Sequence, residues 1–548
     1  MDVAQLVGTT LARLGAGHAF GVVGSGNFAL TNALRAQGVP FVATRHEGGA
    51  ATMADAYARM SGRVAVVTTH QGCGFTNALT GIGEAAKSRT PLIVLTADTA
   101  NGAVRSNFRI DQDAAARSVG AIAERVHSAH TAVDDTVRAY TTALRERRTV
   151  VLNVPLDVQV QQADEPAGIR APEPAGAIRP AATSVSALAD AITRARRPVF
   201  VAGRGARAAA AELRAVAELA GALLATSAVA NGLFHDDPWS LGISGGFASP
   251  LTAELISGAD LIVGWGCALN MWTMRHGKLI GPDTTVAQVD VEQSALGADR
   301  PIHVGVLGDA GQTATDLHTE LTSRGHHANG YRDNALRARI AAEARWRSVP
   351  YPDLSTNDRI DPRTLSARLD ELLPAERVLA VDSGNFMGYP SAYLSVPDEH
   401  GFCFTQAFQS IGLGLATAIG AALALPDRLP VAALGDGGFL MSVAEMDTVV
   451  RLGLPMVVVV YNDSAYGAEV HHFTDSTDEE LASVRFPETD IAAIGRGFGA
   501  TGVTVRTTDD LAGIGDWLAG DRGTPLVVDA KITSDGGAWW LAEAFHKH

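Results

Sequence analysis

Two acidic residues in the last quarter of the chain each follow an apolar run of strand length. The first run, residues 431–434, leads into a glycine-rich turn made of Gly435, Asp436, Gly437 and Gly438. The second run, residues 455–461, leads into Asn462 and Asp463. Parallel strands joined by a helix end at the same edge of a sheet, so Asp436 and Asp463 are expected to meet there. Carboxylate oxygens suit a hard divalent cation, and a glycine-rich turn at a helix start suits a diphosphate.

The helix between these two runs carries its own boundary signals. Ser442 and Glu445 have the spacing of a capping box, which predicts that the helix starts there, and Gly453 suits its end. A glycine-rich tetrapeptide alone is more often an ordinary strand-to-helix turn than a ligand site. The second aspartate, 27 positions after Asp436 on the next strand, favours the ligand site.

The GDG motif at residues 435–437, followed by Asn462 and Asp463, resembles the thiamine-diphosphate motif of an enzyme superfamily. That superfamily includes pyruvate decarboxylase, benzoylformate decarboxylase and acetolactate synthase, and the resemblance covers essentially the whole chain. It implies that Mg²⁺ is held by Asp436, the Asp463 side chain and the backbone carbonyl of Ala465. The family usually has a second asparagine at the position of Asp463. The extra charge should strengthen Mg²⁺ binding and repel the diphosphate, and aspartate is also tolerated in related sequences.

A glutamate in the first segment suits activation of this cofactor. Glu47 stands in the sequence RHEGGAA, which leads into a helix through Tyr57 and Arg59. Alone, a glutamate in the first turn of a helix is more often a surface residue that complements the helix dipole. Here it resembles the family glutamate that hydrogen bonds N1′ of the aminopyrimidine, whose imino tautomer takes the proton from thiazolium C2. The cofactor-binding domains of this family face each other across subunits, which implies a homodimer or homotetramer with active sites at the dimer interface.

The resemblance also assigns the remaining cofactor contacts. They are Asn77, Ser383, Gly384, Asn385, Gln409, Ile411, Gly435, Gly437, Gly438, Tyr466 and Gly467. Ile411 would lie beneath the cofactor and force its bent shape, although a position in the core explains it equally well. The segment 382–385 follows the apolar run 378–381, which places its backbone and Asn385 near the diphosphate.

Three further side chains are candidates for catalysis. Ser25 falls where benzoylformate decarboxylase has an active-site serine, and His70 aligns with the proton-transfer histidine of that enzyme. Glu469 has the spacing of the catalytic glutamate of pyruvate decarboxylase. Three more residues are candidate substrate contacts: Gln71, His471 and His472. A structural role is the commoner alternative for any single histidine or glutamate, but the strand-end position of His70 favours function.

The middle of the chain departs from acetolactate synthase. The first segment resembles that enzyme closely, but residues 264–272 replace the stretch that contacts flavin and substrate there. No arginine remains in this stretch, and the next one is Arg275. FAD is therefore doubtful, although residues 203–205 and 307–309 leave room for a nucleotide.

Together these residues imply a thiamine-diphosphate- and Mg²⁺-dependent 2-oxoacid decarboxylase and carboligase. Its C2-carbanion enamine would be protonated or added to a second carbonyl, from an aldehyde or ketone acceptor. An acyl transferase of the acetolactate synthase type stays open, as does a lyase or hydrolase that cleaves acyloins or diketones. Glu47, Asp436 and Asp463 disfavour a non-catalytic protein that merely binds the cofactor. A nicotinamide-dependent enzyme is disfavoured because the glycines within residues 21–26 lack the dinucleotide spacing.

The apolar runs predict the architecture that positions these residues. Runs of strand length alternate with helical patterns, which is typical of parallel sheets covered on both faces. The runs lie at 64–67, 92–95, 150–154, 199–202, 261–263, 378–381, 431–434, 456–461 and 526–528. Two stretches, 161–184 and 326–357, break the rhythm and are predicted linkers, the second with a helix through 342–348. We therefore expect three doubly wound α/β domains: pyrimidine-binding at 1–160, central at 185–325 and diphosphate-binding at 358–548.

The composition of the 548-residue chain disfavours other classes of protein. Asp plus Glu number 59 and Lys plus Arg 44, a net charge of −15 that repels phosphate backbones and disfavours nucleic-acid binding. The three cysteines lie far apart, which argues against a disulfide framework and fits a reducing compartment. The longest apolar runs fall short of the roughly 18 residues of a membrane span, and the first residues lack a signal-peptide pattern. We therefore expect a cytoplasmic protein without membrane partners.

Overall fold

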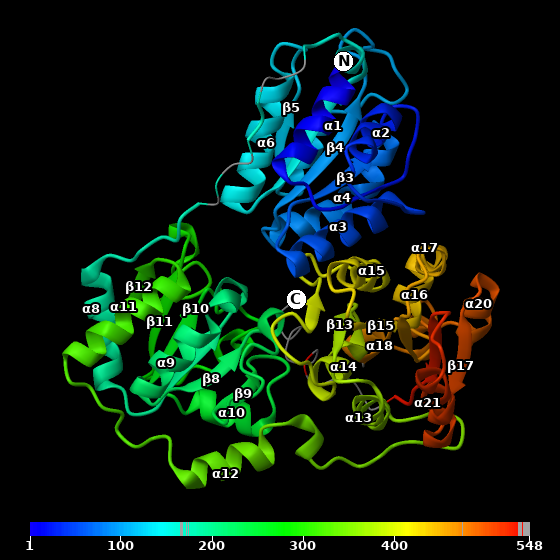
Figure 1. Ribbon diagram of the computed structural model, residues 1–548. Coiled ribbons are helices and arrows are strands. Elements are labelled where there is room, and N and C mark those ends of the chain that lie inside the picture. Colours follow the sequence, from blue (N-terminus) through cyan, green and yellow to red (C-terminus); the bar gives the residue numbers. More distant parts are fainter. Residues whose placement is uncertain (165–167, 171–172, 174, 474, 535–539, 541–548) are drawn as a thin grey trace.

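The computed structural model describes residues 1–548 except 165–167, 171–172, 174, 474, 535–539 and 541–548. It contains three six-stranded sheets, in which every pair of neighbouring strands is parallel. Helices flank each sheet (Figure 1). The predicted fold of three doubly wound α/β domains is confirmed, and each of the nine predicted strands is present in it.

The N-terminal sheet has the strand order β2-β1-β3-β4-β6-β5. Its strands are β1 (Ala19–Gly21), β2 (Phe41–Ala43), β3 (Ala65–Thr69), β4 (Leu92–Asp98), β5 (Ile122–Arg125) and β6 (Thr149–Pro155). Its helices are α1 (Val3–Leu14), α2 (Phe28–Ala36), α3 (Glu47–Ser61), α4 (Cys73–Lys87), α5 (Gln112–Ser118), α6 (Ala132–Glu146) and α7 (Leu156–Gln159). Strands β3, β4 and β6 are buried along their whole length, as expected of continuous apolar runs in a parallel sheet.

The C-terminal sheet repeats this order as β14-β13-β15-β16-β18-β17. Its strands are β13 (Arg377–Val381), β14 (Phe402–Phe404), β15 (Leu429–Gly435), β16 (Val457–Asn462), β17 (Thr501–Val505) and β18 (Leu526–Lys531). Its helices are α13 (Pro362–Leu372), α14 (Gly388–Tyr393), α15 (Gly414–Ala424), α16 (Asp436–Ser442), α17 (Met446–Arg451), α18 (Gly467–His472), α19 (Asp478–Leu481), α20 (Ile491–Phe498) and α21 (Ala512–Ala519).

The central sheet has a different order, β12-β11-β10-β7-β8-β9. Its strands are β7 (Pro198–Ala202), β8 (Leu223–Thr226), β9 (Ser240–Ile243), β10 (Leu261–Trp265), β11 (Thr285–Asp290) and β12 (Val304–Leu307). Its helices are α8 (Ala182–Arg194), α9 (Ala210–Ala220), α10 (Pro250–Ser257) and α11 (Ala310–Ser323), and α12 (Asn334–Glu343) follows in the second linker. The chain reverses direction across the sheet between β7 and β10, which is where doubly wound sheets bind ligands.

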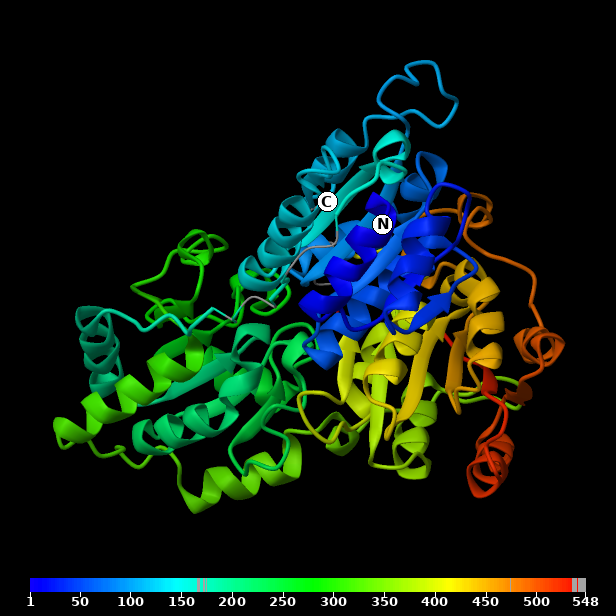
Figure 2. The same cartoon turned by 45° about the horizontal axis from the view of Figure 1, so that its top comes forward.

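The two outer domains pack on each other through corresponding helices. Along the sequence, helix α3 and helix α15 each follow the second strand of their domain and precede the third. The two helices contact each other closely. A side chain at Gly420 would place its Cβ 2.2 Å from the backbone oxygen of Met53, so only glycine allows this approach. Residues of both domains, Ala54 and Ile419 among them, share one apolar cluster. Figures 1 and 2 accordingly show the N-terminal domain seated on the C-terminal one.

A buried ionic network joins the domains beside this helix pair. Arg59 forms ion pairs with Asp55 at 2.6 Å and Glu84 at 2.8 Å, and it donates to the Phe404 backbone oxygen at 3.0 Å. Glu84 also accepts the backbone N–H groups of residues 407 and 408, at 3.1 and 2.6 Å. Burial opposes ionisation of Glu84, but Arg59 and these N–H groups hold its pKa below the usual value. The network therefore fixes the loop of the C-terminal domain that carries Gln409 and Ile411.

Two expected helix boundaries are wrong. Helix α16 begins at Asp436, directly after the strand, and ends at Ser442, and a 3₁₀ turn over residues 443–445 follows it. The Ser442 hydroxyl donates back to the Gly438 oxygen at 2.9 Å, so it does not form a capping box with Glu445. In the second linker, α12 covers residues 334–343 and only a short 3₁₀ turn spans 346–348. This helix starts earlier in the chain than expected because Asp333 caps it, accepting from the Leu336 N–H at 2.7 Å.

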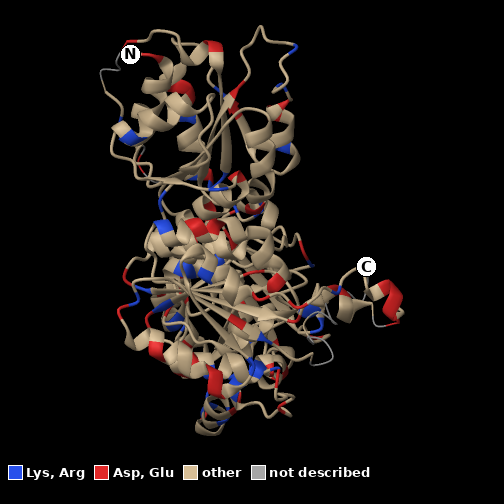
Figure 3. Cartoon of the chain, turned by 90° about the vertical axis from the view of Figure 1, so that its right-hand side faces the viewer, with Lys and Arg blue, Asp and Glu red and all other residues tan. Residues whose placement is uncertain are grey.

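The surface and the linkers complete the fold. The three sheets fall inside the predicted domains, whose boundaries at residues 160, 184, 325 and 357 stay predictions. Acidic and basic residues interleave along all three domains (Figure 3). Among the described residues, no helix is long and apolar enough to cross a membrane.

Candidate active site

The loop after β1 carries Ser25 and is held by a buried asparagine. Asn27 accepts from the Gly24 N–H at 2.8 Å and donates to the Thr68 hydroxyl at 3.0 Å and to the Val22 oxygen at 3.1 Å. The loop is therefore fixed against the end of β3. A side chain at Gly24 would collide with the ring of His70, so the glycine brings loop and histidine together.

His70 follows β3 and faces Ser25 with a defined tautomer. Its Nδ1 lies 2.9 Å from the backbone oxygen of Gln71, and its Nε2 lies 3.4 Å from Ser25 Oγ. A carbonyl oxygen only accepts, so the Nδ1 of the neutral ring carries the proton and Nε2 is left as an acceptor. The edge of Phe108 packs on the ring at 4.9 Å between centroids. The pair can therefore take up or release a proton at Nε2.

Glu47 begins α3 on the same edge of the sheet. It is buried, and its Oε2 accepts from Asn77 Nδ2 at 3.1 Å. A Cβ at Gly74 would lie 3.1 Å from both Glu47 Oε1 and the Cβ of His70, which shows how closely the two side chains flank this glycine. Gln71 is buried nearby, and its Oε1 has no hydrogen-bond partner within the described part of the chain. The N-terminal sheet edge thus brings together five predicted residues: Ser25, Glu47, His70, Gln71 and Asn77.

Asp436 and Asp463 meet at the corresponding edge of the C-terminal sheet. Burial raises the pKa of both carboxyl groups, and the Asp436 charge raises that of Asp463 further, while the buried Lys531 partly offsets the effect on Asp436. The backbone hydrogen bonds described around the turn use the oxygens of Ser464 and Tyr466 and leave that of Ala465. Two close carboxylates and a carbonyl oxygen form a donor set that a hard divalent cation would satisfy.

The glycines at this edge are required by close approach of side chains. A Cβ at Gly438 would lie 2.2 Å from Asp382 Oδ2, and one at Gly467 would lie 2.2 Å from Asp463 Oδ2. At Gly437 the obstacle is the Tyr466 ring, 2.7 Å away. The start of α16 therefore carries no side chain at Gly437 and Gly438, which lets a diphosphate approach the backbone. The residues present fit both groups of the implied cofactor pair, the metal and the diphosphate.

Two residues that support the candidate site were not predicted from the sequence. Asp382 is fully buried and accepts from the N–H groups of Ser383 at 2.8 Å, Gly412 at 2.9 Å and Leu413 at 3.2 Å, which ties the Ile411 loop to the end of β13. Burial raises the pKa of Asp382 to about 6, and these N–H groups oppose the shift. The sequence predicts Glu445 in a helix capping box, but its side chain accepts from the N–H groups of Arg45 and His46, both at 3.0 Å. It fixes the start of α3 from the C-terminal domain.

Removing one carboxylate of the Asp436–Asp463 pair should change stability in a pH-dependent way. Because the pKa of Asp463 is raised in the folded state, the metal-free protein loses stability as pH rises through the window between the ordinary and the raised value. We therefore expect Asp463→Asn to raise the metal-free Tm at about pH 8 more than at about pH 5, and Mg²⁺ to stabilise the native protein more at the higher pH. Thermal denaturation with and without Mg²⁺ measures both effects. A pH-independent gain would contradict the paired-carboxylate arrangement.

A cavity of about 450 Å³ lies between the central and C-terminal domains. Five predicted residues line it: Ser383, Gly384, Gln409, Ile411 and Glu469. On the central side it reaches the ends of β7 and β10 through Arg204 and Cys267, the position expected for a ligand in a doubly wound sheet. Trp540 closes one wall, and the rest of the aromatic C-terminal stretch lies outside the described residues.

The remaining predicted residues lie around this cavity or apart from it. Asn385 is buried next to Gly467, and Tyr466 packs edge-on against Phe486. His471 and His472 follow Glu469 on α18 but do not line the cavity. The cluster around Glu47 and His70 does not line it either. In one chain, therefore, the two groups of predicted residues occupy separate places.

Comparisons with known proteins follow the same three-part division. The family model for the N-terminal TPP binding domain of thiamine pyrophosphate enzymes matches residues 1–117, the central-domain model 185–317 and the C-terminal TPP binding domain model 382–530. A sulfoacetaldehyde acetyltransferase of Roseovarius nubinhibens is 28% identical, over 98% of this chain and 93% of its own. A probable 2-ketoarginine decarboxylase of Pseudomonas aeruginosa is 29% identical, over 93% and 90%. A putative acetolactate synthase large subunit of Mycobacterium tuberculosis is 27% identical, over 91% of each. The chain belongs to the thiamine pyrophosphate enzyme family.

Proposed function

We propose that the chain is a thiamine-diphosphate- and Mg²⁺-dependent 2-oxoacid decarboxylase and carboligase. Its family makes it a thiamine-pyrophosphate-dependent lyase or transferase. When bound, thiamine diphosphate supplies a nucleophilic thiazolium carbon and an electron sink for the bond that breaks. The observation that carries the proposal is the Ser25–His70 pair beside Glu47, which offers an acceptor nitrogen and a hydroxyl at one sheet edge. Such a pair moves the proton that product formation requires.

The other residues bind and orient. Asp436, Asp463 and the backbone oxygen of Ala465 would hold Mg²⁺, and the N–H groups at the start of α16 would face the diphosphate. Glu47 would hold a proton for N1′ of the pyrimidine, with Asn77 fixing the carboxyl orientation. Glu469 would serve as a second proton carrier from the cavity wall. Trp540 and Phe247 add apolar surface to that wall.

The separation of the two groups of residues supports a homodimer, alone or within a tetramer. The Glu47 cluster belongs to the N-terminal sheet edge, while the Asp436 pair and Glu469 belong to the C-terminal edge. The cavity of one chain is lined by Glu469 but by no member of the Glu47 cluster. A partner chain that brings its N-terminal edge to this cavity would complete the site. Each chain would then contribute Glu47 to a cofactor held by the other.

A second candidate is an acetyltransferase that acts on an anionic aldehyde. Several relatives are named sulfoacetaldehyde acetyltransferase. In this chain the cavity is lined by two cations, Lys87 and Arg204. Burial lowers the pKa of Arg204 to about 10, with the charge of Arg59 acting in the same direction. A bound sulfonate or carboxylate would compensate this charge.

One panel of reactions separates these activities. The enzyme is supplied with thiamine diphosphate, Mg²⁺ and a series of 2-oxoacids, including pyruvate and 2-ketoarginine, with and without aldehyde acceptors such as sulfoacetaldehyde. Release of free aldehyde supports decarboxylation, and a new hydroxyketone supports ligation. Consumption of sulfoacetaldehyde in the absence of any 2-oxoacid supports the transferase instead. Absence of turnover on every substrate would overturn the proposal.

Truncating the histidine should affect catalysis and leave cofactor binding in place. We expect His70→Ala to lower kcat by about 10²-fold, because no other group replaces Nε2 as the proton acceptor, with cofactor affinity nearly unchanged. Steady-state kinetics and calorimetric titration of thiamine diphosphate measure the two quantities. His130→Ala, at an exposed position of the same domain, is the matched control. Equal losses in kcat and affinity would assign His70 a structural role.

A further inference from the structure

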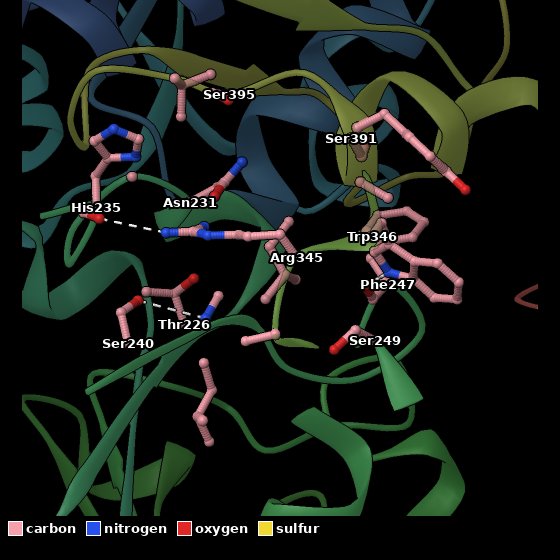
Figure 4. Close-up of a pocket in the computed structure, with 18 of the residues that line it drawn as sticks. Thr226, Asn231, His235, Ser240, Phe247, Ser249, Arg345, Trp346, Ser391 and Ser395 are labelled. Carbon is pink, nitrogen blue, oxygen red and sulfur yellow. Dashed lines mark hydrogen bonds between the residues drawn. The ribbon is translucent and has the colours of Figure 1, made fainter. Parts of the chain in front are cut away.

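A second cavity, of about 290 Å³, lies where the central domain, the second linker and the C-terminal domain meet. Its walls are the ends of β8 and β9, the linker turn at residues 344–347 and the stretch 391–396 that includes the end of α14. None of the cofactor or catalytic residues proposed above lines it. Figure 4 shows polar side chains gathered around one arginine in its middle.

Arg345 extends from the linker across this cavity. Its Nη2 donates to the backbone oxygen of His235 at 3.3 Å. In Figure 4, Asn231 lies on one side of the guanidinium, and Thr226 and Ser240 lie on the other. A guanidinium has five N–H donors in a planar fork, so most of them remain for another acceptor.

Two hydroxyl groups near Arg345 also have hydrogens to donate. Thr226 ends β8, is 3% exposed, and its Oγ1 has no hydrogen-bond partner within the described part of the chain. A buried hydroxyl without a partner is costly. Ser240 Oγ accepts from the Gly242 N–H at 3.4 Å, which leaves its own hydrogen for a ligand. The cavity therefore has converging donors and an excess of positive charge.

The carboxylate of Asp370, whose charge acts on Arg345, is already neutralised. Asp370 pairs with Arg377 and accepts from the N–H and hydroxyl of Ser395, at 2.7 and 2.9 Å. Arg347 lies 3.6 Å from the same carboxylate. Desolvation by the cavity walls and the charge of Arg347 lower the pKa of Arg345, and Asp370 only partly opposes them, although part of the Arg345 side chain stays exposed to solvent. An anion in the cavity would supply the missing countercharge.

We propose that this cavity is a binding site for a small oxyanion, a phosphate or carboxylate group held by Arg345, Thr226 and Ser240. Charge-assisted hydrogen bonds from a guanidinium fork are the strong kind and match the two oxygens of either group. The ligand would bridge the linker and the central domain, against a wall supplied by the C-terminal domain. The site is separate from the one that holds the cofactor, and the inference does not rest on the proposed reaction.

One residue connects this site with the catalytic cavity. Phe247 lines both cavities. Trp346, next to Arg345, donates its indole N–H to the Phe247 oxygen at 2.7 Å, and the Phe247 ring packs on Trp540 with centroids 6.0 Å apart. Binding of an anion at Arg345 is therefore expected to change KM for the substrate more than kcat.

The test uses the holoenzyme loaded with thiamine diphosphate and Mg²⁺, so that the cofactor site is filled. Inorganic phosphate and acetate are titrated separately by calorimetry, and Tm is measured in parallel. We expect at least one of the two anions to bind and raise Tm, and the tighter one identifies the natural group as phosphate or carboxylate. Arg345→Gln should weaken that binding at least tenfold, and Thr226→Val should weaken it severalfold.

Arg337→Gln is the matched control, because it removes the same charge from an exposed position of α12 that lines neither cavity. It should bind the anion like the unaltered enzyme. Failure of both anions to bind, or equal binding by Arg345→Gln, would overturn the proposal. Because Thr226→Val changes only a hydroxyl, it keeps the test valid if the arginine variant is unstable.

Discussion

Replacing Glu47 by glutamine is expected to lower kcat by about 10²- to 10⁴-fold while cofactor affinity stays nearly constant. Glutamine has the same shape and its amide oxygen can still accept from Asn77, whose Nδ2 lies 3.1 Å from the native carboxylate. What the variant lacks is a carboxyl proton to share with the pyrimidine. Steady-state kinetics, calorimetric titration of thiamine diphosphate, and deuterium exchange of the thiazolium proton followed by NMR measure the three quantities.

The control for this variant is Glu146→Gln, an exposed position at the end of α6 in the same domain. It should keep full activity. Wild-type exchange of the thiazolium proton in Glu47→Gln would contradict the assigned role. A large fall in Tm would instead indicate that the buried glutamate is mainly structural.

The second large effect concerns the proposed Mg²⁺ site. Asp436→Asn should weaken Mg²⁺-supported binding of thiamine diphosphate by at least about 100-fold, because loss even of a group behind the ligands costs 10- to 100-fold. Without metal the same change should not lower Tm, since burial raises the pKa of Asp436 and its ionised form is unfavourable in the folded state. Calorimetry at several Mg²⁺ concentrations and thermal denaturation without metal measure these effects.

Asp509→Asn, an exposed change of the same charge in the same domain, should leave both quantities unchanged. If Asp436→Asn bound the cofactor normally at low Mg²⁺, the metal would have to lie elsewhere. If Asp436→Asn lowered the metal-free Tm, the native carboxylate would stabilise its own turn in the absence of a cation.

Much of the fold follows from apolar runs alone, and the exceptions have physical reasons. Strands β4 and β16 are buried on both faces and show as continuous apolar runs. Strands β1, β2 and β14 have only three residues each, too few to stand out in a sequence. Strand β11 contains Gln288 and Asp290 and lacks an uninterrupted run. Such strands are defined by their neighbours in the sheet.

The candidate site divides in the same way. Asp436 and Asp463 could be paired from sequence because both follow strands of one strand–helix–strand unit, and parallel strands end together. Glu445 contacts residues 400 positions away, and no local pattern indicates that partner. The effects of Asp382 and Lys531 depend on their being buried. The sequence alone does not indicate that a charged residue is buried. The anion site at Arg345 needs three separate segments and appears only once the domains are assembled.

The equal strand orders of the outer sheets, with α3 packed on α15, make each chain an internal pseudo-dimer of two like domains. Duplication and fusion of a gene for one self-associating domain would produce this arrangement, because a twofold contact joins like surfaces. His70 and Asp436 follow the third strand of their respective copies, and Ser25 and Ser383 follow the first. The same architectural positions would then carry the proposed proton transfer in one copy and the proposed metal and phosphate contacts in the other. Evolutionary change of substrate should therefore concentrate in the first copy and the central domain.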